Sequence, residues 1–203
     1  MADHYLSWTL PFPATDIPAD LATADGQELP DLIGQAMGEP GVLRTRSRRD
    51  WLNGALVNVC SAFGGSALAF LVKDPESLPG DRLIHSSPVG VGRLRFQERW
   101  LITALTHAGI PDALAEIESW LATATHNPER FVAPLVTDDV EIVAEEARDA
   151  VDLTEAGATH EDGDRPRYFF SFIKGLRRVL LDAHARRLAV LHVRYVYLFS
   201  TDQ

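Results

Sequence analysis

Cysteine is almost absent from this 203-residue chain, because Cys60 is the only one. A single cysteine excludes an intrachain disulfide and a zinc site built from several cysteines, and it favours a reducing compartment. Lysine is also scarce, with only Lys73 and Lys174 among 19 basic residues, which we ascribe to coding bias. The first ten residues have no basic n-region, so no secretory signal is expected and the predicted location is cytoplasmic.

The chain also lacks the excess of positive charge that is typical of proteins binding nucleic acid or anionic lipid. Its formal net charge is -10, from 29 acidic and 19 basic residues. This balance favours basic partners, and it makes membrane association unexpected. Apolar residues make up 46% and charged residues 24% of the chain, as in a soluble globular protein. The length suits a single domain with its own core, over residues 1–203.

Charged residues are missing altogether from the stretch 51–72. A span of that length beside a basic cluster has the dimensions of a transmembrane helix. Asparagine, serine and glycine residues interrupt its middle, however, and argue against membrane insertion. We therefore favour two buried strands, 56–63 and 67–72, joined as a hairpin by Gly64-Gly65, since glycine readily adopts the positive φ of a tight turn.

Elsewhere, short apolar patterns alternate with breaks rich in proline and glycine. Alternation predicts a strand over 4–10 and a short strand at Leu83-Ile84. Helical spacing predicts helices over 30–38, from Leu94 to Gly109, from Pro111 to the break at Asn127-Pro128, and over 138–155. The second and third of these helices are expected to form a helical hairpin, and 131–136 reads as a strand or an extended link.

The C-terminal run 165–199 combines dense apolar residues with a regular charge pattern. Phe169, Ile173, Leu176 and Leu180 share one helical face and basic residues share the other, which predicts an amphipathic helix. From Leu188 onward, alternating and β-branched apolar residues predict a strand. A hairpin of two strands, 176–181 and 188–198, is the competing interpretation.

These elements predict an α+β fold of one domain. We expect a mainly antiparallel sheet, made from the N-terminal strand, the 56–72 hairpin and the C-terminal strand, packed against several helices. Residues 157–164 are expected to form a mobile acidic loop.

Charge is segregated along the last third of the chain. Residues 138–164 hold eleven Asp or Glu and the single Arg148, whereas 165–199 hold eight Arg or Lys and the single Asp182. Two interpretations stay open: the acidic helix packs beside the basic helix through weak surface pairs, or the two segments form separate surfaces of opposite sign that steer partners.

Candidate binding residues come from three charged clusters. Three carboxylates at successive helical turns share one face and could bind a divalent cation with His160 as an added ligand, although a solvated acidic face is commoner. Four arginines before Trp51 could contact phosphates, although such a cluster more often marks an exposed turn. The predicted binding residues are Glu141, Glu145, Asp149, Arg44, Arg46, Arg48, Arg49, Arg177 and Arg178.

No catalytic motif is present: there is no P-loop, no nucleophile elbow and no zinc spacing, and Gly90-Val91-Gly92 is too short for a dinucleotide fingerprint. Cys60 could be a nucleophile if a histidine such as His85 or His107 lay beside it. Its apolar neighbours instead indicate a buried residue. His184 and His192 are expected to be packing or surface residues, and no metal or cofactor is predicted.

The sequence therefore favours a non-enzymatic, partner-binding protein, an accessory or immunity-type subunit with segregated acidic and basic surfaces, whose partner is a protein and by charge a basic one. One alternative is a small enzyme or ligand-binding protein with a pocket near Cys60. Another is a subunit that contacts nucleic acid through its arginine clusters within a larger assembly.

Overall fold

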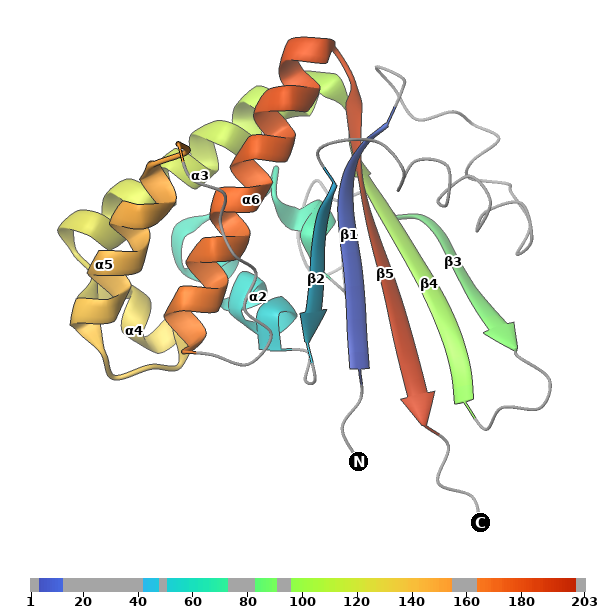
Figure 1. Cartoon of the computed structure of the whole chain (residues 1–203), viewed down its shortest axis with the longest axis horizontal. Coiled ribbons are helices and arrows are strands. Elements are labelled where there is room, and N and C mark those ends of the chain that lie inside the picture. The colour runs from blue at the N-terminus through green and yellow to red at the C-terminus, as the bar shows by residue number, and fades with distance from the viewer. Residues whose placement is uncertain are drawn as a thin grey trace.

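The described α-helices lie on one side of a five-stranded antiparallel sheet in the computed structural model (Figure 1). The structure describes residues 4–12, 42–47, 51–72, 83–90, 96–154 and 164–199. This arrangement confirms the predicted α+β class, with an antiparallel sheet packed against several helices. The helix predicted over 30–38 lies outside the described residues, as does the loop predicted over 157–164 apart from Asp164.

The sheet has the strand order β2-β1-β5-β4-β3, and every neighbouring pair is antiparallel. Its strands are β1 (His4–Phe12), β2 (Leu43–Ser47), β3 (Leu83–Gly90), β4 (Phe96–Leu105) and β5 (Ala189–Phe199). The last strand, β5, lies at the centre and pairs with the first, so that Leu6 faces Tyr195 and Pro11 faces Val190. The strands predicted at the two ends of the chain are therefore confirmed, and the short strand predicted at Leu83-Ile84 is part of the longer β3.

The hairpin predicted over 56–72 is wrong, because this stretch begins with the helix α2 (Trp51–Phe63). Its buried residues recur at helical spacing: Leu52, Ala55, Leu56, Val59 and Cys60. Gly64, with φ 80°, ends the helix, and its N–H donates to the carbonyl of Cys60 at 2.9 Å. The glycine pair thus terminates a helix, a position that also favours positive φ, and the short 3₁₀ helix η1 (Ala69–Leu71) follows.

No helix in the described ranges combines the length and the apolar character that crossing a bilayer requires. The charge-free stretch is instead split between α2 and η1, whose apolar residues belong to the hydrophobic core.

The helix predicted from Leu94 to Gly109 is also wrong, since Phe96–Leu105 is the strand β4, paired with β3 on one side and β5 on the other. No helical hairpin is formed with the next element. The short 3₁₀ helix η3 (His107–Gly109) leads directly into α3 (Ile110–His126), which confirms the helix predicted to begin at Pro111.

Residues 131–136 are helical apart from the last, contrary to the prediction of a strand or an extended link. The helix α4 (Glu129–Leu135) starts after Pro128 and buries Phe131 and Leu135. It ends at Val136, which has the left-handed φ of 51°. Pro128 stands at the N-terminal end of this helix and Pro134 lies inside its last turn. The two prolines keep the helix short, which explains why the local pattern resembled a link.

The remaining helices agree with the sequence-based expectations. The acidic helix is α5 (Val140–Val151) and the basic amphipathic helix is α6 (Arg165–Arg186), so the competing hairpin interpretation is wrong. Arg187, with φ 59°, reverses the chain after α6, and the N–H of Leu188 donates to the carbonyl of Ala183 at 2.8 Å. This left-handed cap delivers the chain directly into β5.

Helix α6 lies between the sheet and the outer helices (Figure 1). It contacts β1, β2 and β5 on one side and α3 and α5 on the other, so it is buried around most of its circumference. Phe169, Phe170, Ile173 and Leu176 are among its fully buried side chains. A helix with apolar residues over so wide an arc is expected in the middle layer of a domain.

The helix-facing side of the sheet carries a buried polar row. Thr9 and His192 lie opposite each other on β1 and β5, and their side chains are joined by a hydrogen bond of 2.9 Å between Oγ1 and Nδ1. Arg194 donates to Oδ1 of Asn53 at 2.7 Å. Burial, and secondarily the nearby charge of Arg194, lowers the pKa of His192 well below its usual value. The ring of His192 is therefore neutral at pH 7.

Candidate functional site

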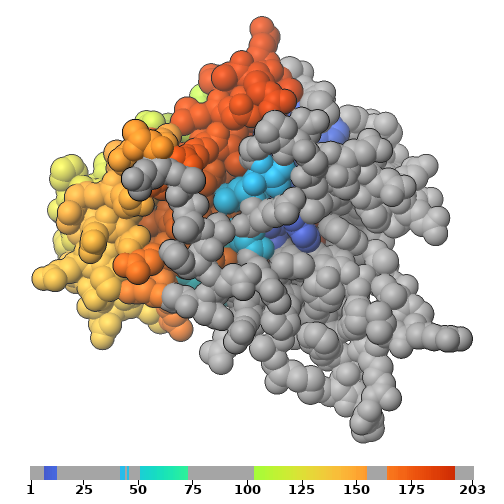
Figure 2. Space-filling view, in the orientation of Figure 1, coloured from blue at the N-terminus to red at the C-terminus, as the bar shows by residue number. Residues whose placement is uncertain are grey.

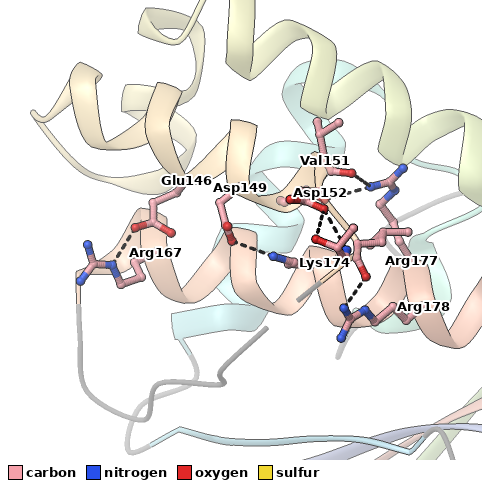
Figure 3. A network of polar contacts seen from close by, with 11 residues as sticks. Glu146, Asp149, Val151, Asp152, Arg167, Lys174, Arg177 and Arg178 are labelled. Carbon is pink, nitrogen blue, oxygen red and sulfur yellow. Dashed lines mark hydrogen bonds and ion pairs between the residues drawn. The ribbon is translucent and has the colours of Figure 1, made fainter. Parts of the chain in front are cut away.

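Helices α5 and α6 are joined by a network of polar contacts (Figure 3). Nε of Arg167 donates to Glu146 at 2.7 Å, and Nζ of Lys174 donates to Asp149 at 3.1 Å. Since both partners advance along their helices in the same direction, α5 and α6 run parallel. The predicted packing of the acidic helix beside the basic one is thereby confirmed.

The two arginines predicted as binding residues on α6 both contact the C-terminal end of α5 (Figure 3). Arg177 donates to the carbonyls of Ala150 at 2.9 Å and Val151 at 3.2 Å, and Arg178 donates to that of Leu153 at 2.5 Å. The last carbonyls of a helix have no partner within it and carry the negative end of its dipole. Arg177 therefore stabilises the end of α5 from the neighbouring helix, and Arg178 holds the segment that directly follows α5.

Two further groups in this network have shifted pKa values. The hydrogen bond to Glu146, more than its charge, raises the pKa of Arg167, and hydrogen bonds from Thr154 lower the pKa of the Asp152 carboxyl. Both side chains are thus held in their charged forms at neutral pH.

The three carboxylates predicted to share one face of α5 differ in their surroundings. Asp149 pairs with Lys174, whereas Glu141 and Glu145 are exposed and form no hydrogen bond or ion pair within the described residues. His160, considered as an added ligand, lies outside those residues. The described ranges contain no group of three metal-ligating side chains close enough to hold a cation.

The pair of Lys174 and Asp149 is unequal, because the lysine side chain is 2% exposed and the aspartate 58%. Lys174→Met is expected to change the free energy of unfolding by less than about 1 kcal/mol, since a buried ion pair contributes little more than an apolar side chain of similar size. Asp149→Asn should cost about 1–2 kcal/mol, because it leaves a buried ammonium without its carboxylate while solvent screens part of the loss. Urea denaturation measures both, and a larger loss in the methionine variant would contradict this assignment.

The predicted arginine cluster is only partly described. Arg44 and Arg46 lie in the edge strand β2, opposite Trp8 and Leu6 of β1, so the turn expected here is a strand at these two positions. Arg48 and Arg49 lie outside the described residues.

Cys60 is buried in α2, at 5% exposure, as its apolar neighbours indicate, although on a helix and not on the predicted strand. Gly65 covers it closely: a Cβ added there would lie 2.6 Å from the sulfur and 3.0 Å from Cζ2 of Trp120. Of the two histidines considered as its partners, His107 stacks on His184, with ring centroids 5.1 Å apart, and the side chain of His85 lies outside the described part. Burial removes Cys60 as an accessible nucleophile.

Gly65→Ala is expected to lower the free energy of unfolding by about 1–3 kcal/mol, because the new methyl group overlaps the Cys60 sulfur. Cys60→Ala removes that sulfur, so the double variant should recover part of the loss. Thermal or chemical denaturation of the two single variants and the double variant gives the interaction energy. Additive losses would mean that the sulfur does not face Gly65.

A groove of about 590 Å³ opens where α3 begins and β4 ends. Its walls include Ala67, Leu105, Thr106, Asp112 and Glu116, and Cys60 does not line it. The carboxylate of Glu116 accepts hydrogen bonds at 3.1 Å from the N–H groups of Ala67 and Leu68, so it holds the segment after α2 against α3. No pattern in the sequence indicates this groove, because Leu105 fits the helix predicted up to Gly109 and Pro111 indicates only the start of the next helix.

The outer helices carry nearly all of the net charge of the protein. Residues 110–152, which span α3, α4 and α5 and are called the acidic layer below, contain eleven Asp or Glu and two Arg, a formal charge of -9 out of -10. Helices α4 and α5 form the left edge of the face seen in Figure 2. The exposed carboxylates of this layer belong to Asp112, Glu118, Glu129, Asp138, Glu141, Glu145, Asp149 and Asp152.

Basic side chains in the described part mostly contact the protein itself. Arg165 donates to the carbonyl of Val136 at 3.1 Å, Arg186 pairs with Asp182 at 3.0 Å, and Arg130 lies 5.1 Å from the ring centre of Phe63. Contacts within the protein were given above for Arg167, Lys174, Arg177 and Arg178. The described basic side chains are therefore largely paired within the protein, whereas many carboxylates are exposed to solvent.

No known protein family, curated protein or solved structure matches this chain.

Proposed function

We propose that the protein is a non-enzymatic, cytoplasmic binding protein, of the accessory or immunity type, whose acidic layer binds a basic partner protein. The observation that supports this most strongly is the difference between its two kinds of charge. Glu141, Glu145 and Asp138 are exposed without a hydrogen bond or ion pair in the described ranges, whereas the basic side chains of α6 mostly contact α5 or the sequence around it.

A surface of this kind favours association with a positively charged surface. Exposed carboxylates that have no partner inside the protein create a negative potential around it. This potential raises the association rate of a basic partner and disfavours binding of an acidic one. The same potential repels the phosphates of nucleic acid, so the acidic layer does not favour the nucleic-acid hypothesis. Cys60, the nucleophile on which the enzyme hypothesis depends, is buried. No other group in the described residues gives that hypothesis comparable support.

The test is quantitative affinity capture of the tagged protein from extracts of its own cell type, with wild type and two variants compared side by side. The test variant is Glu141→Gln with Glu145→Gln, which removes two charges from α5. The matched control is Asp164→Asn with Asp182→Asn, which removes two charges outside the acidic layer.

The proposal predicts one or more basic proteins that are recovered with wild type and the control variant and reduced several-fold with the α5 variant, as expected for charges that contribute up to about 1 kcal/mol each. Equal recovery by all three proteins would contradict it. Recovery of nucleic acid in place of a protein would favour the alternative function.

A further inference from the structure

The groove between α3 and β4 has the properties of a receptor for a long cationic side chain. It combines an apolar wall, formed by Ala67, Leu105 and Ala115, with the carboxylates of Asp112 and Glu116. Neither Lys nor Arg is among its lining residues. Arginine and lysine have the matching pair of properties, an apolar stem and a cationic head.

The carboxylates of Glu116 and Asp112 differ in the hydrogen bonds that they accept. Glu116 is engaged on both oxygens by the N–H groups of Ala67 and Leu68 and by the hydroxyl of Ser66 at 3.3 Å, so it contributes negative charge to the groove but has little capacity for another donor. Asp112 is exposed in the first turn of α3, with no hydrogen bond or ion pair in the described part of the chain.

The shape of the groove depends on a close approach of η3 to the end of β4. A Cβ added to Gly109 would lie 2.7 Å from Cδ1 of Leu105, so only glycine fits at this point without displacement. Hydrogen bonds from the segment after α2 to Glu116 fix the opposite wall. The groove is thus built from three separate parts of the chain that these contacts hold together, and it lies at the edge of the acidic layer, where α3 begins.

We infer that this groove binds one arginine or lysine side chain of the basic partner, with its stem against Leu105 and Ala115 and its charged head at Asp112. The inference rests on the proposed function, since it names the point of the acidic layer at which a partner side chain enters. A bidentate guanidinium makes arginine the better fit for a single carboxylate.

The experiment uses N-acetyl-arginine amide as the probe and backbone amide NMR of the whole protein as the measurement. Saturable shifts are expected at Ala67, Thr106, Gly109, Asp112 and Glu116. N-acetyl-citrulline amide, which has nearly the same shape without the charge, should bind at least about fivefold more weakly, the factor that corresponds to roughly 1 kcal/mol.

Three variants separate charge from shape. Asp112→Asn should weaken the arginine probe about fivefold, and Ala115→Trp should weaken it as much by filling the groove without altering charge. Glu118→Gln removes the same charge from an exposed position of α3 outside the groove, and it should change the affinity less than twofold.

Equal binding of the neutral probe, or the absence of saturable shifts, would overturn the inference. Shifts spread along α5 to the same extent as in the groove would also overturn it, because the probe would then be attracted only by general negative charge, as the proposed function alone expects. The two proposals can also fail separately. If the arginine probe binds specifically in the groove but affinity capture is unchanged by the α5 variant, the proposed function is contradicted, whereas the groove remains a site for cationic side chains.

Discussion

Trp120→Ala is expected to lower the free energy of unfolding by about 3–5 kcal/mol, the largest loss among the variants considered. Trp120 is 1% exposed on α3, where its ring reaches the segment after α2 close to Gly65. Its Nε1 also donates to the carbonyl of Gly64 at 2.9 Å. The substitution therefore creates a cavity and leaves a carbonyl without its donor.

Urea denaturation followed by circular dichroism measures this loss without depending on tryptophan fluorescence. Trp120→Phe, which keeps most of the buried ring but removes the donor, should cost about 1–2 kcal/mol. Glu118→Ala, on the exposed side of the same helix, should stay within about 0.5 kcal/mol of wild type. A loss below about 1 kcal/mol for Trp120→Ala would place this ring outside the core.

Acid should destabilise the protein through His192, which is buried on β5 beside Thr9 and Arg194. The folded-state pKa lies well below the usual value of 6.5, so between these two values the unfolded state binds more protons than the folded state. Stability therefore decreases as the pH falls below about 6.5, by up to about 1.4 kcal/mol per pH unit, and is independent of this group above pH 7 or so.

The measurement is the free energy of unfolding from pH 8 to pH 5 for wild type and His192→Asn. The variant loses packing and is expected to be less stable at pH 8, but it lacks the titrating ring. The difference between the two proteins should therefore shrink as the pH falls below about 6.5. Parallel curves over the whole range would show that His192 is protonated to the same extent in both states.

The elements that could be predicted from the sequence are those whose pattern is local. In the 22-residue helix α6, Phe169, Ile173 and Leu176 recur at the helical period, and β5 begins shortly after this helix ends. The acidic helix α5 was recognised in the same way, because its apolar and charged faces separate within a few turns.

Two of the wrong assignments depended on distant partners. In β4, Phe96, Trp100 and Leu105 fit a helical face, yet this segment is a strand paired with β3 on one side and β5 on the other. Periodicity alone does not separate a short apolar run such as 100–105 from part of a helix. At the end of α2, the pair Gly64-Gly65 is compatible with both a hairpin turn and a helix end. The helix end places this pair against Trp120 of α3, a distant contact that no local pattern contains.

The contacts of the candidate sites also depend on residues that are far apart in the sequence. From charge counts along the chain, the packing of the acidic helix beside the basic one was one of two interpretations, and the pairing of Lys174 with Asp149 depends on the parallel packing of α5 and α6. The groove at Asp112 joins residues from α2's end, β4's end and α3, which are up to 50 positions apart, so no local pattern contains it.

The most direct test of the proposed function is the salt dependence of the dissociation constant between the purified protein and the partner recovered by affinity capture. The affinity is expected to weaken steadily between about 50 and 500 mM salt, over which the Debye length falls from roughly 14 to 4 Å. Glu141→Gln with Glu145→Gln should bind more weakly at low salt and depend less on salt. An affinity that is independent of salt and unchanged in this variant would contradict the claim that the acidic layer binds the partner.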